Sequence, residues 1–212
     1  MKKIIAIAAV VLLGSHAAKA DLLVGWDFAG LAGITTGSVT SNVADADMAD
    51  TSTMLISRGS GLTPASNTGG YAANNWSTTF DTTDYYEFNA IADDGYIFDV
   101  TNITLNIRRS GTGPSNFVIR SSADNFTSDL DAFVAVANGA YASPITLSAQ
   151  TNVTFRLYGY DASGAAGSMN LGGTGNDLVI QGTISVVPEP GTLAILSLGF
   201  LSLYGIRRRR QH

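Results

Sequence analysis

Apolar and polar side chains alternate with a period of two residues in several parts of the chain. Residues 103–108 carry isoleucine or leucine at every odd position and threonine, asparagine or arginine at every even position. This pattern predicts a β-strand with one face in the core and the other in solvent. Residues 153–158 and 180–186 alternate in the same way. Short runs rich in β-branched or aromatic residues predict further strands at 22–28, 54–58, 76–80, 85–91, 117–120 and 133–136.

The segments between these runs are rich in residues that favour turns. Glycine, asparagine, aspartate, serine and threonine recur at intervals of roughly 8–12 residues, and helical periodicity is nearly absent. The short connection at 110–114 predicts that residues 103–108 and 117–120 form an antiparallel pair. The pattern as a whole indicates an all-β fold, a two-sheet antiparallel sandwich of jelly-roll type with about nine or ten strands.

The first twenty residues have the three parts of a secretory signal peptide. Lys2 and Lys3 give a positive start, residues 4–13 form an apolar segment, and Ala18 and Ala20 supply the small residues that signal peptidase requires. We therefore expect an N-terminal signal helix and cleavage that leaves Asp21 as the first residue of the mature chain. A lasting N-terminal anchor is the weaker alternative, because a segment of this length is too short to span a bilayer.

The end of the chain, residues 188–212, combines three features that a globular core does not accommodate. Pro188, Glu189 and Pro190 form an extended acidic tripeptide, because proline restricts its own φ and keeps the preceding residue extended. An apolar run follows, and the chain then carries four arginines, Arg207, Arg208, Arg209 and Arg210. As a helix, residues 191–206 would be ~24 Å long, shorter than the ~30 Å hydrocarbon core. We therefore expect a C-terminal apolar helix that anchors the chain transiently in the inner membrane, with the arginines in the cytoplasm.

This order of features resembles the PEP-CTERM sorting signal of exported bacterial proteins. The residues that carry the resemblance are Val187-Pro188-Glu189-Pro190-Gly191, the apolar run and the arginine cluster. The resemblance implies a Gram-negative host that produces polysaccharide, in which a membrane-embedded exosortase recognises and processes the tail. The chain then divides into a signal peptide at 1–20, a β-sandwich domain at 21–187 and a sorting segment at 188–212.

Charge and composition exclude several classes of function for the domain at 21–187. It contains five arginines, no lysine and 16 acidic residues, a net charge of −11, so it would repel the phosphates of a nucleic acid. The chain has no cysteine, and its two histidines, His16 and His212, lie in the predicted terminal segments. The domain therefore lacks the residues for a Ser-His-Asp triad, a Cys-His pair or an ordinary zinc site.

Carboxylates remain as catalytic or metal-ligating groups. Two clusters in predicted loops offer the hard oxygen ligands that suit Ca²⁺, and their members are Asp45, Asp47, Asp50, Asp93 and Asp94. Neither cluster matches an EF-hand loop, and aspartate is a preferred turn residue. The favoured interpretation is therefore that these aspartates lie in solvent-exposed turns, and a calcium site is the alternative. A glycosidase would need two carboxyl groups about 5 to 9 Å apart, and Glu87 is the single glutamate of the domain.

Seven aromatic residues are candidates for a platform on which sugar rings stack. They are Trp26, Tyr71, Trp76, Tyr85, Tyr86, Tyr158 and Tyr160. Aromatic side chains in strands more often belong to the core or to cross-strand pairs. A core position is therefore favoured for the tyrosines, and above all for Trp26, which lies within an apolar run.

The domain also resembles a β-rich domain that recurs in exported proteins with this tail. The residues that carry this resemblance are Trp26-Asp27-Phe28-Ala29-Gly30, Ser57-Arg58-Gly59-Ser60-Gly61-Leu62, Asn75-Trp76, Tyr85-Tyr86-Glu87-Phe88, Arg109-Ser110-Gly111-Thr112-Gly113-Pro114 and Phe155-Arg156-Leu157-Tyr158-Gly159-Tyr160. This resemblance supports the fold and implies no activity.

Together these observations predict an exported, non-catalytic protein of the cell surface or extracellular matrix that associates with exopolysaccharide, as in a biofilm. The expected partners are signal peptidase, an exosortase-type enzyme and extracellular polysaccharide, with transient contact to the inner membrane and none to nucleic acid. The alternative is a carboxylate-based glycan-active enzyme.

Overall fold

The computed structural model describes residues 21–34 and 36–187, which form two antiparallel β-sheets packed face to face. The predicted signal helix and the predicted apolar helix of the tail lie outside these residues. In the described part of the chain, no helix has the length and apolar character needed to cross a membrane. Apart from strands, it contains two short 3₁₀ turns, η1 (Thr51–Thr53) and η2 (Ser122–Asp124).

Eight strands form the larger sheet, and six form the smaller one. The members of the eight-stranded sheet are β1 (Asp21–Trp26), β3 (Val43–Ala44), β5 (Thr63–Pro64), β6 (Tyr71–Asn74), β8 (Tyr96–Arg109), β11 (Gly139–Gln150), β13 (Met169–Leu171) and β14 (Leu178–Val186). The members of the six-stranded sheet are β2 (Val39–Thr40), β4 (Leu55–Arg58), β7 (Tyr85–Ile91), β9 (Asn116–Ser121), β10 (Asp131–Val134) and β12 (Asn152–Tyr160).

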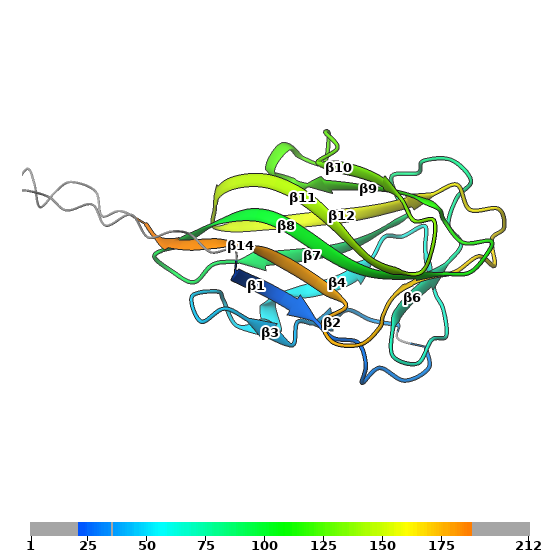
Figure 1. Cartoon of the computed structure of the whole chain (residues 1–212), viewed down its shortest axis with the longest axis horizontal. Coiled ribbons are helices and arrows are strands. Elements are labelled where there is room, and N and C mark those ends of the chain that lie inside the picture. Colours follow the sequence, from blue (N-terminus) through cyan, green and yellow to red (C-terminus); the bar gives the residue numbers. More distant parts are fainter. Residues whose placement is uncertain (1–20, 35, 188–212) are drawn as a thin grey trace, which may run out of the picture.

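The long strand β8 is the centre of the larger sheet. Its sheet has the order β3-β1-β14-β8-β13-β6-β5, in which β14 and β13 pair with successive parts of β8, and β11 pairs with β8 outside this order. The six-stranded sheet has the order β10-β9-β12-β7-β4-β2. Figure 1 shows the layer of β11, β8, β14 and β1 lying over the layer of β10, β9, β12 and β7. The two-sheet antiparallel sandwich predicted from the period-two pattern is therefore confirmed.

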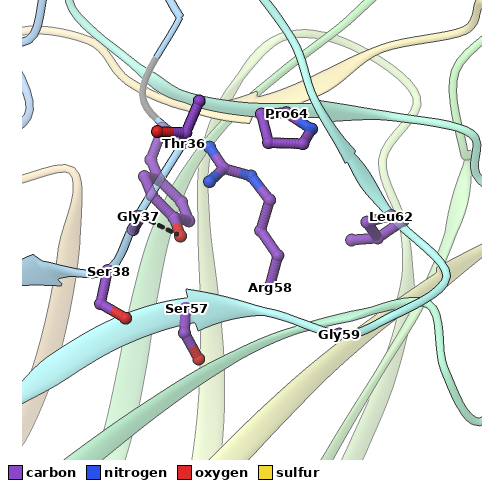
Figure 2. A pocket seen from close by; sticks show the side chains of 9 residues that line it. Thr36, Gly37, Ser38, Ser57, Arg58, Gly59, Leu62 and Pro64 are labelled. Atoms are coloured by element: carbon purple, nitrogen blue, oxygen red, sulfur yellow. Dashed lines mark hydrogen bonds between the residues drawn. The ribbon is translucent and has the colours of Figure 1, made fainter.

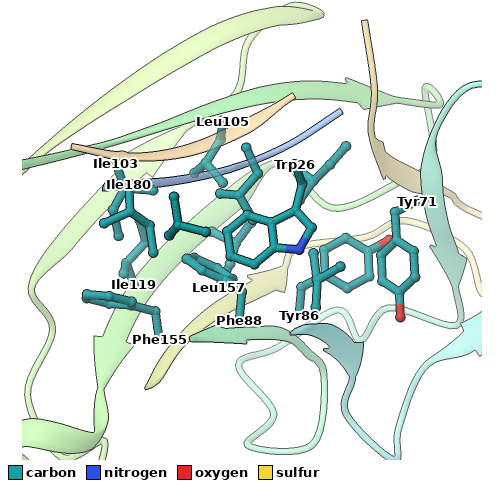
Figure 3. Packing of buried hydrophobic residues seen from close by; sticks show 14 of the residues in the cluster. Trp26, Tyr71, Tyr86, Phe88, Ile103, Leu105, Ile119, Phe155, Leu157 and Ile180 are labelled. Carbon is teal, nitrogen blue, oxygen red and sulfur yellow. The ribbon is translucent and has the colours of Figure 1, made fainter. Parts of the chain in front are cut away.

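The core lies between the two sheets and is filled by the inward-facing positions of the alternating strands. Ile103 and Leu105 of β8 and Ile180 of β14 point toward Leu157 and Phe88 of the opposite sheet (Figure 3). All five side chains are fully buried. The even positions of residues 103–108 lie on the other face and are half-buried or exposed, as the alternation predicts.

The predicted antiparallel pair of residues 103–108 and 117–120 is wrong. β8 belongs to the eight-stranded sheet, whereas β9 belongs to the six-stranded sheet and pairs with β10 and β12. The connection between them crosses from one sheet to the other. Arg109 fixes this crossing, because its Nε and Nη2 donate hydrogen bonds to the carbonyl oxygens of Pro114 (2.7 Å) and Gly113 (3.1 Å).

The strand predicted at 76–80 is also wrong, since these residues form an irregular connection between β6 and β7. Its aromatic residues have separate roles. Trp76 enters the core and donates its indole N–H to the carbonyl oxygen of Ala73 at 3.0 Å. Phe80 lies on the outer surface, where 37% of its area is exposed.

Candidate functional site

Aromatic side chains gather on the outer face of the six-stranded sheet. The alternation of β7 directs Tyr86 and Phe88 into the core and leaves Tyr85 on the opposite face. In β12 the same rule places Tyr158 and Tyr160 outward. Phe80 reaches this face from the connection between β6 and β7. We call Phe80, Tyr85, Tyr158 and Tyr160 the aromatic strip.

The four rings of the strip contact one another in a continuous row. The ring centroids of Phe80 and Tyr158 are 5.2 Å apart, those of Phe80 and Tyr160 5.9 Å, and those of Tyr85 and Tyr158 5.5 Å. Tilted and edge-to-face pairs at these distances are favourable arrangements of aromatic rings. Tyr158 is only 2% exposed and packs under its neighbours, while Phe80 has the largest exposed fraction of the four residues. Burial raises the pKa of the Tyr85 hydroxyl, and the nearby Arg156 opposes this rise.

Two arginines cover parts of the strip, and each is held by a carboxylate. Arg156 lies with its guanidinium 4.3 Å from the ring centroid of Tyr85, and its Nε is 2.7 Å from Oε2 of Glu87. Arg120 lies 4.6 Å from the ring centroid of Phe80, and its Nε is 2.7 Å from Oδ1 of Asp129. The face therefore combines apolar ring surface with paired hydrogen-bond donors and acceptors in fixed positions.

A pocket of about 250 Å³ adjoins the strip on the same face, and we call it the sheet pocket. Its lining residues are Ser38, Thr53, Leu55, Ser57, Glu87, Phe88, Asn89 and Thr154. The Asn89 amide is already engaged, because its Oδ1 accepts a hydrogen bond from the backbone N–H of Leu55 (2.7 Å) and its Nδ2 donates to the Thr53 carbonyl (3.2 Å). Glu87 contributes the single carboxylate in the described lining of this pocket.

A second pocket, of about 280 Å³, opens at the end of the sandwich, and we call it the end pocket. Figure 2 shows the Arg58 side chain among the residues that line it, with Thr36, Gly37 and Ser38 on one side and Leu62 and Pro64 on the other. The Arg58 guanidinium lies over the Tyr71 ring, 3.6 Å from its centroid. Burial raises the pKa of the Tyr71 hydroxyl, and the positive charge of Arg58 opposes this rise.

The structure separates the seven aromatic candidates into two groups. Four of them lie in the core with at most 3% of their area exposed, namely Trp26, Tyr71, Trp76 and Tyr86. The other three, Tyr85, Tyr158 and Tyr160, belong to the aromatic strip. The preference for a core position is thus confirmed for Trp26, Tyr71 and Tyr86 and is wrong for Tyr85 and Tyr160, while Tyr158 is buried but lies on the outer face. Phe80, Arg120 and Arg156 were not among the candidates, although the alternation of residues 153–158 already places Arg156 on the same face as Tyr158.

The five aspartates named as calcium candidates come from two neighbouring loops. The backbone N–H of Asp93 donates to the Asp47 carbonyl at 3.0 Å, and Met48 forms a β-bridge with Ala92. Their side chains do not converge: within residues 21–34 and 36–187, no three aspartate, glutamate, histidine or cysteine side chains form a group that could hold a metal ion.

Some of these carboxylates stabilise local turns. Asp45 Oδ1 accepts a hydrogen bond from the backbone N–H of Asp47 at 3.1 Å. Asp50 Oδ1 accepts one from the backbone N–H of Ser52 at 2.7 Å, which caps η1 and lowers the pKa of Asp50. These contacts are the ones expected of turn aspartates.

The remaining predicted site residues are at the ends of the chain. Asp21 is exposed and begins β1, where it pairs with Gly182 of β14. The other members of the cleavage and sorting signals lie outside the described residues, namely Ala18, Ala20, Pro188, Glu189, Pro190, Arg207, Arg208, Arg209 and Arg210. The described domain ends at Val187, whose backbone N–H donates to the Gly95 carbonyl at 2.8 Å.

The model of the PEP-CTERM protein-sorting motif matches residues 186–210. The chain therefore carries this motif at its C-terminus, as the order of its tail features predicts. A search of curated proteins found no match to the chain.

Among solved structures, a mutant of a family 29 carbohydrate-binding module, studied for its ligand recognition, is similar to the chain with a TM-score of 0.34 and 9% identity. The alignment covers 71% of this chain and 89% of the module. A likeness this distant carries no argument about the ligand of the domain.

Proposed function

We propose that this chain is an exported, non-catalytic protein of the cell surface or extracellular matrix, and that its aromatic strip binds extracellular polysaccharide. The PEP-CTERM motif at residues 186–210 supports export and sorting. On this account, signal peptidase removes residues 1–20, the tail holds the domain transiently at the inner membrane of a Gram-negative cell, and an exosortase-type enzyme processes the tail. The sandwich is of the jelly-roll type, which the repeated crossings between its two sheets support.

The observation that carries the binding proposal is the position of the aromatic strip. Three partly exposed rings, those of Phe80, Tyr85 and Tyr160, pack around buried Tyr158 on one outer face of a sheet. Two arginine–carboxylate pairs and the sheet pocket lie beside them. Sugars have apolar C–H faces and a periphery of hydroxyl groups. Ring surface flanked by fixed polar groups is the general composition of small-molecule binding sites.

The same geometry gives less support to the glycan-active enzyme. Glycosidases use two carboxyl groups about 5 to 9 Å apart around the scissile bond. Glu87 is the one carboxylate in the described lining of the sheet pocket, and it is paired with Arg156. The described lining therefore offers no second carboxylate that could share the acid and base roles with Glu87.

A binding assay combined with an assay for reducing ends separates the two functions. The full chain, purified in mild detergent, is incubated with extracellular polysaccharide, and both retention on the polysaccharide and release of reducing ends are measured. We expect retention without release. Release of reducing sugar would support the enzyme, and the absence of retention would contradict the binding role.

Processing of the tail has its own test. Intact-mass spectrometry of the protein recovered from the outside of host cells measures the C-terminus directly. We expect a mass that lacks the arginine cluster at the end of the chain. An exported pool that keeps residues 207–212 would rule out processing.

A further inference from the structure

Arg58 is held rigidly at the floor of the end pocket. Its Nε and Nη2 both donate hydrogen bonds to the Ala72 carbonyl oxygen, at 3.0 and 2.8 Å. One face of the guanidinium is covered by the Tyr71 ring, and the Tyr71 hydroxyl donates to the Gly37 carbonyl at 3.1 Å. Because β4 pairs with β7 at Arg58 and Tyr86, the backbone is fixed as well. The position of the cation therefore does not depend on a ligand.

The charge of Arg58 is not neutralised by the rest of the described domain. The ion pairs of residues 21–34 and 36–187 involve Arg120 and Arg156, and Arg58 forms none. A guanidinium has five N–H donors, and the contacts with Ala72 use two of them. Nη1 donates no hydrogen bond of ordinary distance and angle to the described residues, although the Tyr71 and Tyr86 hydroxyls interact with the guanidinium. Arg109 is also fixed without an ion pair, but Arg58 is the arginine that lines a pocket in this domain of net charge −11.

The walls of the end pocket suit an anionic ligand that also carries hydroxyl groups. The described residues of its lining include no aspartate or glutamate, and Thr36, Ser38 and Ser57 supply hydroxyls that donate or accept hydrogen bonds. Leu62 and Pro64 supply apolar surface. A volume of about 280 Å³ is near the lower limit of about 300 Å³ for ligand pockets, which suits one sugar residue.

We propose that the end pocket binds the carboxylate of an acidic sugar residue, a uronate, within the polysaccharide that the aromatic strip holds. This inference rests on the proposed function and adds the class of sugar. The free N–H groups of Arg58 would donate to the carboxylate, because the planar guanidinium matches the geometry of a carboxylate.

The two sites are close enough for one polysaccharide chain to reach both. Ser38 and Ser57 line the end pocket and also line the sheet pocket. The sheet pocket contains Glu87, which is paired with Arg156 beside Tyr85 of the aromatic strip. Arg120 and Arg156 are already paired with carboxylates of the domain, so the carboxylate of the sugar is directed to Arg58.

The test compares a uronate oligosaccharide with the same oligosaccharide after reduction of its carboxyl groups to alcohols. Binding of each to the full chain in mild detergent is measured by isothermal titration calorimetry. We expect the uronate form to bind about tenfold more tightly. Arg58→Gln should remove this preference, whereas Arg108→Gln, which removes an exposed arginine of the other sheet, should keep it.

A second variant avoids any effect of Arg58 on folding. Thr36 is exposed and lines the end pocket, so Thr36→Asp places a competing carboxylate beside Arg58 and should also remove the preference. Ser148→Asp adds the same charge on an exposed position of β11, outside the pocket, and should keep it.

The outcomes separate this inference from the proposed function. Equal affinity of the wild-type protein for the two oligosaccharides would overturn the assignment of the end pocket and leave the role of the aromatic strip intact. The same conclusion would follow if the preference survived in both Arg58→Gln and Thr36→Asp. Failure of both oligosaccharides to bind would contradict the proposed function and, with it, this inference.

Discussion

Arg156 and Glu87 face each other across the β12–β7 ladder, with Nε of the arginine 2.7 Å from Oε2 of the glutamate. Their side chains are 26% and 31% exposed, so solvent screens the pair only in part. Arg156 also contacts the rings of Tyr85 and Phe126, at 4.3 and 3.9 Å from their centroids. The pair therefore fixes a cation on the outer face of the sheet rather than in the core.

The ion pair should contribute modestly to stability. In a double-mutant cycle of Glu87→Gln and Arg156→Gln, we expect a coupling free energy of unfolding of about 0.3–1 kcal/mol, the range for partly exposed pairs. Urea denaturation of the four proteins measures it. A coupling free energy indistinguishable from zero would show that the two side chains do not interact in solution.

Asp177 should make stability depend on pH in the opposite direction from the turn aspartates. Its side chain is fully buried before β14, where Oδ2 accepts a hydrogen bond from the backbone N–H of Phe28 at 2.9 Å and Oδ1 has no partner among the described residues. Burial raises the pKa of Asp177, with the bond from Phe28 acting against the rise. A carboxyl with a raised pKa destabilises the folded state when it is charged, and this effect disappears as the pH falls through the folded pKa.

The variant Asp177→Asn isolates this effect. We expect the difference in melting temperature, variant minus wild type, to be largest near pH 7 and to decrease as the pH is lowered. Asp50 and Asp81 have pKa values lowered by hydrogen bonds from Ser52 and Thr83, so the stability they contribute is lost below their usual pKa of 3.8 in both proteins. A difference in melting temperature that stays constant from pH 4 to pH 8 would show that Asp177 does not titrate as described.

Calcium should leave the stability of the domain unchanged. Asp45 and Asp50 accept hydrogen bonds within turns, and no three acidic side chains of the described residues form a group that could hold a metal ion. A ligand at 100 times its Kd stabilises the folded state by about 2.7 kcal/mol, which would raise the melting temperature by several degrees. We expect a shift below about 1 °C in calcium at roughly 10 mM, well above the Kd of weak extracellular sites. A rise of several degrees that EDTA reverses would identify a calcium site instead.

The regular strands were predictable from the sequence, because their two faces meet different environments. β8, β12 and β14 are buried on the face toward the opposite sheet, so their apolar residues recur at every second position. β11 was missed, although it has twelve residues. Ser143 interrupts the apolar series of its inward positions Tyr141, Ile145 and Leu147, and the strand carries Pro144, which edge strands tolerate.

The pairing of strands was less predictable. Alternation shows which face of a strand is buried, but it does not show which other strand lies beside it. The short connection after β8 is compatible with a hairpin, but the hydrogen bonds of Arg109 to Gly113 and Pro114 turn it toward the other sheet. Trp76 and Phe80 were assigned to a strand because aromatic residues favour strands. One fills the core from a connection, and the other covers Tyr158 and Tyr160 from outside.

The candidate site was predictable only in part. Tyr85, Tyr158 and Tyr160 were named as candidates, and the period-two rule could have separated them from Tyr86. Phe80 and Arg58 depend on contacts between segments that are distant in sequence. Arg58 is the last residue of β4, and Ala72 belongs to β6 of the other sheet. The contact of Arg58 with the Ala72 carbonyl therefore depends on how β4 packs against β6 and not on local sequence.

If the aromatic strip binds polysaccharide, the variant Phe80→Ala should bind it more weakly. Phe80 is 37% exposed and contacts Tyr158, Tyr160 and Arg120, so its loss should remove stacking surface and cost about 1 kcal/mol of stability. The control is Val186→Ala, which removes an exposed apolar side chain from the other sheet. Affinity electrophoresis of the full chain in gels that contain extracellular polysaccharide measures binding. We expect Phe80→Ala to weaken retention about tenfold and Val186→Ala to be retained like the wild type. Equal retention of all three proteins would show that the aromatic strip does not bind polysaccharide.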